Sequence, residues 1–307
     1  MLKVRVPATS ANLGPGFDCM GMALTLYNTF TAEPSDELTI SLTGTYTRYI
    51  STNKDNLLWT TMCRFWEIVG RDPQPLNLTL ENDVPPTRGL GSSSTAVVGG
   101  LMLANALTGF PLQRLDLLKL ASDIEGHPDN VVPAFLGGIT LTVQDGETFV
   151  PRLLTTAPDF KAVVVIPDIL VETEKARAIL PRSVSRQDVI FNTSRVGLLV
   201  DAFLRQEYSL LAVATQDRIH QNQRIALVPG LEPALRAALD AGAYGAALSG
   251  SGPALLAFCP DAMAERTAET MLRVLQQYDL KATSLILDVD PIGVQQWTRD
   301  KGQWVVL

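Results

Sequence analysis

The stretch from Pro85 to Ala96 constrains this chain more than any other, because it joins a glycine- and serine-rich loop directly to an Ala- and Leu-rich helical pattern. It reads Pro-Pro-Thr-Arg-Gly-Leu-Gly-Ser-Ser-Ser-Thr-Ala. Glycines let backbone N–H groups approach an anion closely, and a helix N-terminus adds about half a positive charge. Serine hydroxyls can donate to phosphate oxygens or hold magnesium. The stretch therefore predicts a phosphate-binding loop at the start of a helix.

Two familiar glycine-loop classes do not fit this stretch. The Walker A loop requires a lysine after its last glycine, and none is present. The dinucleotide fingerprint requires a third glycine, where Ser94 stands. A serine cap on the helix would explain one serine but not Gly89, Gly91 and three consecutive hydroxyl residues. We therefore favour phosphate binding of another type.

Composition excludes several other classes of protein. Hydrophobic residues make up 46% of the 307 residues and charged residues 19%, which predicts a packed fold and not a disordered or fibrous chain. The net charge is −7 without any basic run, so neither nucleic acid nor an anionic membrane is an expected partner. Three widely spaced cysteines and two histidines favour a reducing compartment and offer no zinc motif. With no apolar stretch of membrane-spanning length, we predict a cytoplasmic protein.

Strand and helix periodicities are mixed along the whole chain, which predicts an α+β fold in two layers. The expected strands lie near residues 2–6, 38–42, 76–80, 138–143, 162–166, 246, 255 and 284–289, and the expected helices at 56–69, 92–108, 112–125, 174–180, 190–215, 232–241 and 262–278. A turn at Ala157-Pro158-Asp159 precedes a continuous apolar strand. We place a domain boundary there, between residues 1–157 and 158–307.

Three further polar clusters accompany the phosphate loop. Ser10–Asp18 and Ser249–Pro253 are glycine loops that alone would be read as tight turns, and Glu125–Asn130 gathers ionisable side chains at a helix end that a proline interrupts. Together and in this order, the loops resemble the GHMP kinase superfamily over nearly the whole chain. Val6–Gly21 and Arg88–Ser94 resemble the homoserine kinase branch in particular.

The resemblance implies an overall fold and a reaction. It implies a two-domain GHMP kinase fold, with an N-terminal domain similar to ribosomal protein S5 domain 2 and a C-terminal ferredoxin-like α/β sandwich. The active site would lie at the interface, and the ATP phosphate loop would belong to residues 1–157. The implied reaction is ATP- and Mg²⁺-dependent phosphorylation of the L-homoserine side-chain hydroxyl to O-phospho-L-homoserine, a step in threonine biosynthesis. A homodimer is a further expectation of the family.

The resemblance also implies roles for individual residues. Asn12 and Asp18 would hold the substrate's amino group, and a carboxylate is the natural partner of an ammonium. The implied carboxylate clamp is Arg177 and Arg224, whose planar guanidinium groups suit it. The remaining implied assignments are His127 and Asn130 for the substrate and its terminal hydroxyl; Ser93 and Glu125 for magnesium; Asn130, Arg177 and Glu125 for catalysis; and Pro86, Thr87, Arg88, Gly89, Leu90, Gly91, Ser92, Ser93, Ser94, Thr95 and Asn56 for ATP.

The expected mechanism rests on positioning. No lysine lies near the phosphate loop or the 125–130 segment, and Asn130 stands where other members of the superfamily carry an aspartate base. Phosphoryl transfer through a loose transition state permits catalysis by positioning and charge neutralisation. We therefore expect the hydroxyl proton to pass directly to the γ-phosphate, with Asp129 as the alternative base.

Three other functions compete with this interpretation. Another GHMP kinase acting on a different alcohol is disfavoured, because two arginines and Asp18 suit a zwitterionic amino acid. A dehydrogenase lacks its complete three-glycine fingerprint. A ligand-sensing relative without catalysis would not need both a phosphate loop and magnesium ligands, and ATP turnover distinguishes it.

Overall fold

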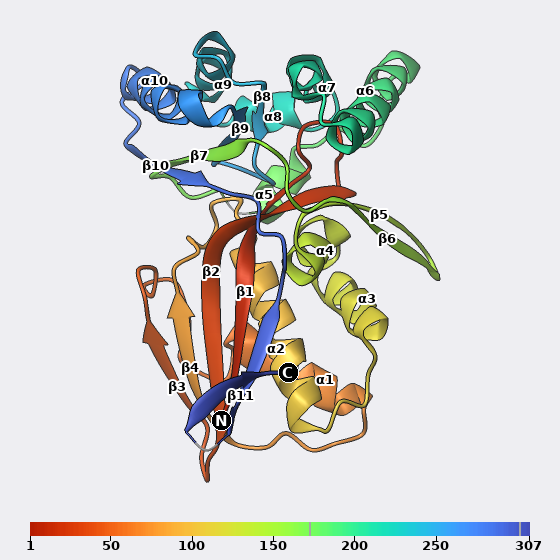
Figure 1. Ribbon diagram of the computed structural model, residues 1–307, viewed down its shortest axis with the longest axis vertical. Helices are drawn as coiled ribbons and strands as arrows, with labels where there is room; N and C mark the ends of the chain where they lie inside the picture. Colours follow the sequence, from red (N-terminus) through yellow and green to blue (C-terminus); the bar gives the residue numbers. More distant parts are fainter. Residues whose placement is uncertain (172, 301) are drawn as a thin grey trace.

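A computed structural model describes residues 1–171, 173–300 and 302–307, which form two sheets stacked along the long axis of the molecule (Figure 1). Within these residues the larger sheet has eight strands and runs in the order β12-β11-β1-β2-β4-β3, with β5 joined to β2 and β6 to β5. The smaller sheet has four strands in the order β10-β7-β9-β8. The α+β architecture expected from the sequence is confirmed.

The larger sheet is built on two long antiparallel strands, β1 (Leu2–Ala11) and β2 (Met20–Pro34). Their register shifts between Pro7 and Ala8, where the proline has no N–H to donate to the ladder. The other strands of this sheet are β3 (Thr39–Thr43), β4 (Leu76–Asn82), β5 (Ile139–Asp145), β6 (Thr148–Thr155), β11 (Gln295–Asp300) and β12 (Gln303–Val306). Because β11 pairs with β1, the end of the chain completes the sheet that its beginning starts. The boundary at residues 157 and 158 stays a prediction.

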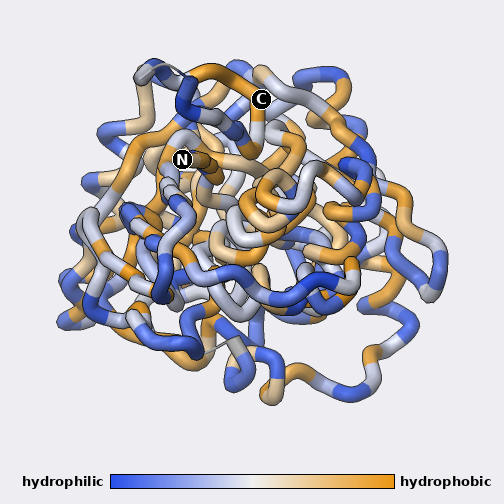
Figure 2. Tube along the Cα trace, turned by 90° about the horizontal axis from the view of Figure 1, so that it is seen from below, coloured by the Kyte–Doolittle hydropathy of each residue, from blue (hydrophilic) through white to orange (hydrophobic). Residues whose placement is uncertain are grey.

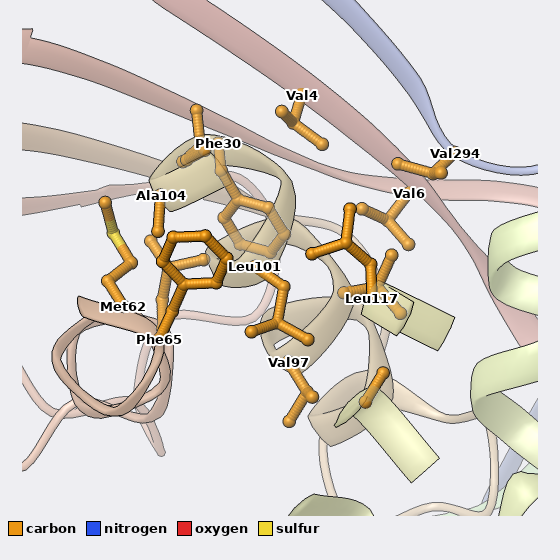
Figure 3. Packing of buried hydrophobic residues seen from close by; sticks show 14 of the residues in the cluster. Val4, Val6, Phe30, Met62, Phe65, Val97, Leu101, Ala104, Leu117 and Val294 are labelled. Atoms are coloured by element: carbon orange, nitrogen blue, oxygen red, sulfur yellow. The ribbon is translucent and has the colours of Figure 1, made fainter. Parts of the chain in front are cut away.

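Four helices cover one face of this sheet, as Figure 1 shows. They are α1 (Leu57–Ile68), α2 (Ser92–Leu107), α3 (Arg114–Glu125) and α4 (Pro128–Leu136). Figure 3 shows side chains of β1 and β2, such as Val4, Val6 and Phe30, packed against Phe65 of α1 and Leu101 of α2. The central helix α2 therefore has a fixed N-terminus, which points toward the smaller sheet.

The smaller sheet is covered on both faces. Its strands are β7 (Lys161–Pro167), β8 (Gly245–Leu248), β9 (Leu255–Cys259) and β10 (Ala282–Leu287), and its helices are α6 (Arg186–Arg205), α7 (Leu211–Ala214), α9 (Leu231–Asp240) and α10 (Ala264–Gln276). Val164 and Phe258 pack with the cluster that includes α6, whereas Val163 and Ala257 pack with the cluster of α9 and α10. This explains why β7 is a continuous apolar run.

Several elements differ from the expectations. The helix predicted to end at Glu125 does end there, but α4 was missed: Pro128 is its first residue, where a proline needs no N–H partner. β2 was missed because Met20–Leu24 is buried on both faces and does not alternate. β6, β11 and β12 were also missed.

The remaining described helices are α5 (Thr173–Ala178), α8 (Gln221–Ile225) and two 3₁₀ turns at Tyr208–Leu210 and Asp261–Met263. Apolar segments wind through the middle of the molecule and hydrophilic loops surround them (Figure 2). None of the helices in the described ranges is both long and apolar enough to cross a membrane.

Candidate active site

A cavity of about 450 Å³ lies where the loop after β1, the start of α2, the α3–α4 turn, α5 and α8 meet. Its size and its mixture of apolar walls with a few converging polar groups are typical of a small-molecule site. Most of the residues singled out from the sequence line it: Asn12, Asp18, Asn56, Pro86, Thr87, Gly89, Leu90, Gly91, Ser92, Ser93, Glu125, His127, Asn130, Arg177 and Arg224.

The phosphate loop presents backbone to this cavity. Gly91 is the N-cap of α2 with φ +67°, so no N-cap side chain occupies the first N–H groups of the helix. A Cβ on Gly91 would lie 2.0 Å from Thr9 Oγ1, and one on Gly89 would lie 2.2 Å from the carbonyl oxygen of Ser249. Both glycines therefore allow neighbouring segments to touch the loop, and they leave the helix N-terminus open to an anion.

Three members of the predicted ATP set do not line the cavity. Arg88 turns away and donates to Asp168 at 3.1 Å. The hydroxyl of Ser94 is fully buried, and the hydroxyl of Thr95 donates to the carbonyl of Ser92. Their side chains thus support the loop, and any contact that they make with a ligand in the cavity would come from backbone groups.

Asn56 has a structural function that the sequence did not suggest. Its Oδ1 accepts from the N–H groups of Leu58 and Trp59, which caps α1, and its Nδ2 donates to the carbonyl of Ser51 at 2.6 Å. It still lines the cavity, beside residues that the sequence analysis missed. These residues are Phe30, Tyr49, Ile50, Ser51, Asp55, Leu57, Leu58, Leu80 and Asn82. Ala96 from the predicted phosphate stretch and Gly250 and Ser251 from the predicted glycine loop line the cavity as well. Tyr49 and Ile50 lie in an irregular loop without a periodic signal, which is why sequence reasoning did not find them.

An oxygen pair joins two helix ends at the rim. Ser93 Oγ, from the start of α2, donates to Glu125 Oε1, at the end of α3, at 2.5 Å. In the described part of the chain no group of three or more His, Cys, Asp or Glu side chains gathers as a metal cluster. Ser93 and Glu125 would thus give a metal ion two oxygen ligands, and the other coordination positions of that ion would be filled by a bound ligand or water.

The turn between α3 and α4 brings together His127, Asp129 and Asn130. His127 Nδ1 lies 2.6 Å from Asp129 Oδ1, and Asp129 is almost fully buried. Burial lowers the pKa of His127, but the hydrogen bond and charge of Asp129 and the charge of Glu125 outweigh it, so the net shift is upward. Asn130 Oδ1 accepts from Thr9 Oγ1 at 2.8 Å. Thr9 was missed by the sequence analysis, because a threonine in a strand carries no distinctive signal.

The loop after β1 holds Asp18 in a constrained backbone. Asn12, Leu13 and Asp18 all have positive φ values, of 69°, 49° and 55°, which non-glycine residues rarely adopt. Asn12 braces this loop, since its Oδ1 accepts from the N–H of Asp18 and its Nδ2 donates to the carbonyl of Gly250. Asn12 therefore supports the loop from the wall of the cavity.

Asp18 and Arg177 form a two-pronged ion pair across the cavity. Arg177 Nη1 and Nη2 donate to the two carboxylate oxygens of Asp18 at 3.0 and 2.6 Å. The hydrogen bond to Asp18 holds the pKa of Arg177 above its ordinary value. Both side chains are about one-third exposed, so a ligand can reach them from the cavity.

Arg224 is a buried cation in the wall of the same cavity. It is 3% exposed and donates to the carbonyls of Ala176 and Gly250 and to His220 Nδ1. Among the residues that the structure describes, no carboxylate forms a salt bridge with it. Burial and the charge of Arg177 lower the pKa of Arg224. An anion entering the cavity would supply the missing counter-charge.

Comparisons with known proteins identify the family of the chain. The model of the GHMP kinases N terminal domain matches residues 56–138, and that of the GHMP kinases C terminal domain matches residues 199–276. The homoserine kinase of Desulfitobacterium hafniense is 50% identical over 95% of this chain and 99% of its own length, and that of Synechococcus is 46% identical over 96% and 97%. The crystal structure of homoserine kinase from Cytophaga hutchinsonii superposes with a TM-score of 0.85 at 29% identity and covers 96% of each chain.

Proposed function

The chain belongs to the GHMP kinases, a family of small-molecule kinases, and on that premise we propose that it transfers the terminal phosphoryl group of ATP to the side-chain hydroxyl of L-homoserine. The product is O-phospho-L-homoserine. The pathway served by this reaction is threonine biosynthesis.

One observation carries the choice of substrate: the same cavity contains a phosphate loop, an exposed face of Asp18 and two arginines. Arg224 has no carboxylate partner among the described residues, and Asp18 holds Arg177 in the wall of the same cavity. A zwitterionic amino acid matches this arrangement, because its carboxylate fits the two guanidinium groups and its ammonium fits Asp18. Mevalonate has a carboxylate but no ammonium.

The reacting groups meet beside Gly91. The ATP phosphates bind at the open N-terminus of α2, and Asn130 lies directly beside it, since a Cβ on Gly91 would come within 3.0 Å of Asn130 Oδ1. Thr9 fixes the orientation of Asn130 through its hydroxyl. Asn130 then holds the substrate hydroxyl close to the γ-phosphate. Because both reactants are held in place, phosphoryl transfer becomes an effectively unimolecular step.

The donor set at the rim fits Mg²⁺. Mg²⁺ prefers oxygen ligands and is usually held by one or two carboxylates together with substrate phosphates, and Ser93 and Glu125 offer one hydroxyl and one carboxylate from rigid helix ends. When bound there, the ion neutralises charge on the phosphates. Glu125 and Ser93 would hold the ion at the start of α2, beside the phosphate loop.

The hydroxyl proton goes directly to the γ-phosphate in this proposal. Asp129 Oδ1 is engaged by His127 Nδ1 at 2.6 Å, so this oxygen is not free to accept the proton of the substrate hydroxyl. No lysine is found among the described residues that line the cavity. We propose further that the protein acts in the cytoplasm as a homodimer.

The test is a coupled assay of ADP release with ATP, Mg²⁺ and L-homoserine, with L-serine, L-threonine and mevalonate as alternative acceptors. We expect ADP and a phosphomonoester signal in the ³¹P NMR spectrum with L-homoserine alone. Preference for another alcohol would contradict the amino-acid clamp. Binding of ATP without turnover of any acceptor would favour a ligand-sensing relative.

A further inference from the structure

The ring of Phe17 lies against both arginines of the cavity, although Phe17 itself does not line it. The guanidinium carbon of Arg224 is 5.2 Å from the ring centroid, and that of Arg177 is 5.7 Å away. Both distances are within the range in which a cation is attracted to an aromatic ring. Phe17 is thus the one side chain described as contacting both cations through a ring face or edge.

This contact addresses an electrostatic problem in the site. Two guanidinium groups line one cavity, and burial together with the charge of Arg177 lowers the pKa of Arg224. Arg177 has Asp18 as a partner, but the described contacts of Arg224 are two carbonyls and an imidazole. A π system offers negative charge density to both cations and leaves their N–H donors free for a substrate carboxylate, because the phenyl ring carries no oxygen or nitrogen acceptor.

The ring is itself held rigidly. Phe17 stacks on His220, with centroids 5.0 Å apart and an interplanar angle of 27°. His220 is fully buried, its Nε2 lies 2.7 Å from the carbonyl oxygen of Gly14, and its Nδ1 faces Arg224. Burial lowers the pKa of His220, which keeps the imidazole neutral and able to accept from Arg224. His220 therefore connects the loop that carries Phe17 to the helix that carries Arg224.

We propose that Phe17 is a positioning residue for the substrate carboxylate: its ring holds Arg177 and Arg224 in the separation and orientation that bind one carboxylate together. This inference rests on the proposed function and extends it to a residue that touches no substrate. An aliphatic side chain of similar volume would fill the same space but would not attract the two cations.

The test uses the intact enzyme with Phe17→Leu, Phe17→Tyr and a series in which phenylalanine at position 17 carries one, two and three ring fluorines. Fluorine withdraws the negative charge of the ring face while almost preserving its shape. We expect Phe17→Leu to raise the KM for L-homoserine about five- to tenfold, with kcat and the KM for ATP within about twofold, and Phe17→Tyr to restore a near-normal KM. In the fluorinated series the logarithm of this KM should rise with each added fluorine.

Phe191 provides a matched control, because Arg195 and Arg218 lie over its ring at 3.2 and 3.9 Å but it does not line the cavity. The same fluorinated series at Phe191 should leave both KM values unchanged. A KM for L-homoserine that stays constant across the series at Phe17, or that changes in step with the KM for ATP, overturns the inference while leaving the proposed function intact. If the unmodified protein does not phosphorylate L-homoserine, the proposed function fails and this inference fails with it.

Discussion

The two halves of the cavity are built in different ways. The phosphate half is one continuous segment, residues 86–93, whose backbone faces the cavity at the start of α2. The amino-acid half is assembled from Asp18, Arg177 and Arg224, which come from three segments far apart in the chain. The first half depends on what glycine permits, and the second depends on ion pairs and hydrogen bonds between long side chains.

This difference predicts different responses to substitution. A side chain added to the phosphate loop collides with fixed neighbours and disturbs chemistry as well as ATP binding. A side chain removed from the amino-acid half weakens one ligand and leaves the other in place. The predictions below test whether the two halves are as separate as their construction indicates.

The largest effect is expected from Gly91→Ala. The new Cβ would lie 2.0 Å from Thr9 Oγ1 and 3.0 Å from Asn130 Oδ1, so both side chains must move. We expect kcat/KM for L-homoserine and for ATP to fall at least about 100-fold, since a shift of about 1 Å at a reacting group has effects of that size. Steady-state kinetics with each substrate varied in turn measure the change.

Gly70→Ala is the control for backbone strain. Gly70 has φ +66°, almost the value of Gly91, but a Cβ there meets nothing within 4 Å. It should lower the thermal midpoint through backbone strain alone, and so by less than Gly91→Ala, and it should keep full activity. If both variants lose activity equally, the collision at Thr9 is not the cause.

Arg177→Ala should affect the amino-acid half alone. It removes one of the two guanidinium groups and leaves Asp18 without its partner. We expect the KM for L-homoserine to rise about 30-fold, with the KM for ATP changed less than about twofold. Arg182 is exposed and follows α5 in the chain, so Arg182→Ala serves as the control variant. It should change neither KM. A parallel rise of both KM values would show that the two halves are coupled.

Glu125→Gln tests the rim that joins the two halves. The amide keeps the size of the side chain and can still accept from Ser93, but it is a much weaker ligand for Mg²⁺. We expect the Mg²⁺ concentration at half-maximal rate to rise about tenfold and the KM for L-homoserine to stay the same. Asp123→Asn, an exposed carboxylate on the same helix, should not shift the Mg²⁺ titration. An unchanged titration for Glu125→Gln would remove Glu125 from the metal site.

The sequence predicted the phosphate half better than the amino-acid half, for a physical reason. Gly89, Gly91 and the serines form a local pattern because the loop and its helix are contiguous. No local pattern shows that Arg177 lies beside Asp18, because that contact spans 159 positions. The family resemblance assigned both residues to the substrate, but it did not predict their ion pair.

Contacts between segments also explain the smaller misses. Thr9, which orients Asn130 across 121 positions, carries no chemical signature in the sequence. Asn56 was predicted for the ATP site and lines the cavity, but its function as the N-cap of α1 was missed. Phe17 was passed over for the same reason, since its significance lies in the arginines around it. The helix α4 was missed because Pro128 was taken only as a signal that the preceding helix ends, whereas a proline also suits the first position of a helix.

The smallest effect on turnover is expected from Asp129→Asn. If the proton passes directly to the γ-phosphate, the isosteric amide should leave kcat within about threefold at neutral pH, whereas removal of a true general base costs about 100-fold or more. Single-turnover kinetics measure the phosphoryl-transfer step itself, so they show whether slow product release hides a change in its rate. A drop of the larger size would establish Asp129 as the base and would contradict direct transfer.

The same variant should change how stability depends on pH. In the native protein the pKa of His127 is raised, so its contribution to stability is fully present below the unfolded-state pKa of about 6.5 and is lost as pH rises through the higher folded-state pKa. Asp129→Asn removes the main cause that raises the pKa, and burial then lowers it. The thermal midpoint of the native protein should therefore fall relative to that of the variant between about pH 6 and pH 8. Parallel midpoints across this window would show that Asp129 does not raise the pKa of His127. The Asp129 carboxylate would then remain available as a base at the boundary between the two halves.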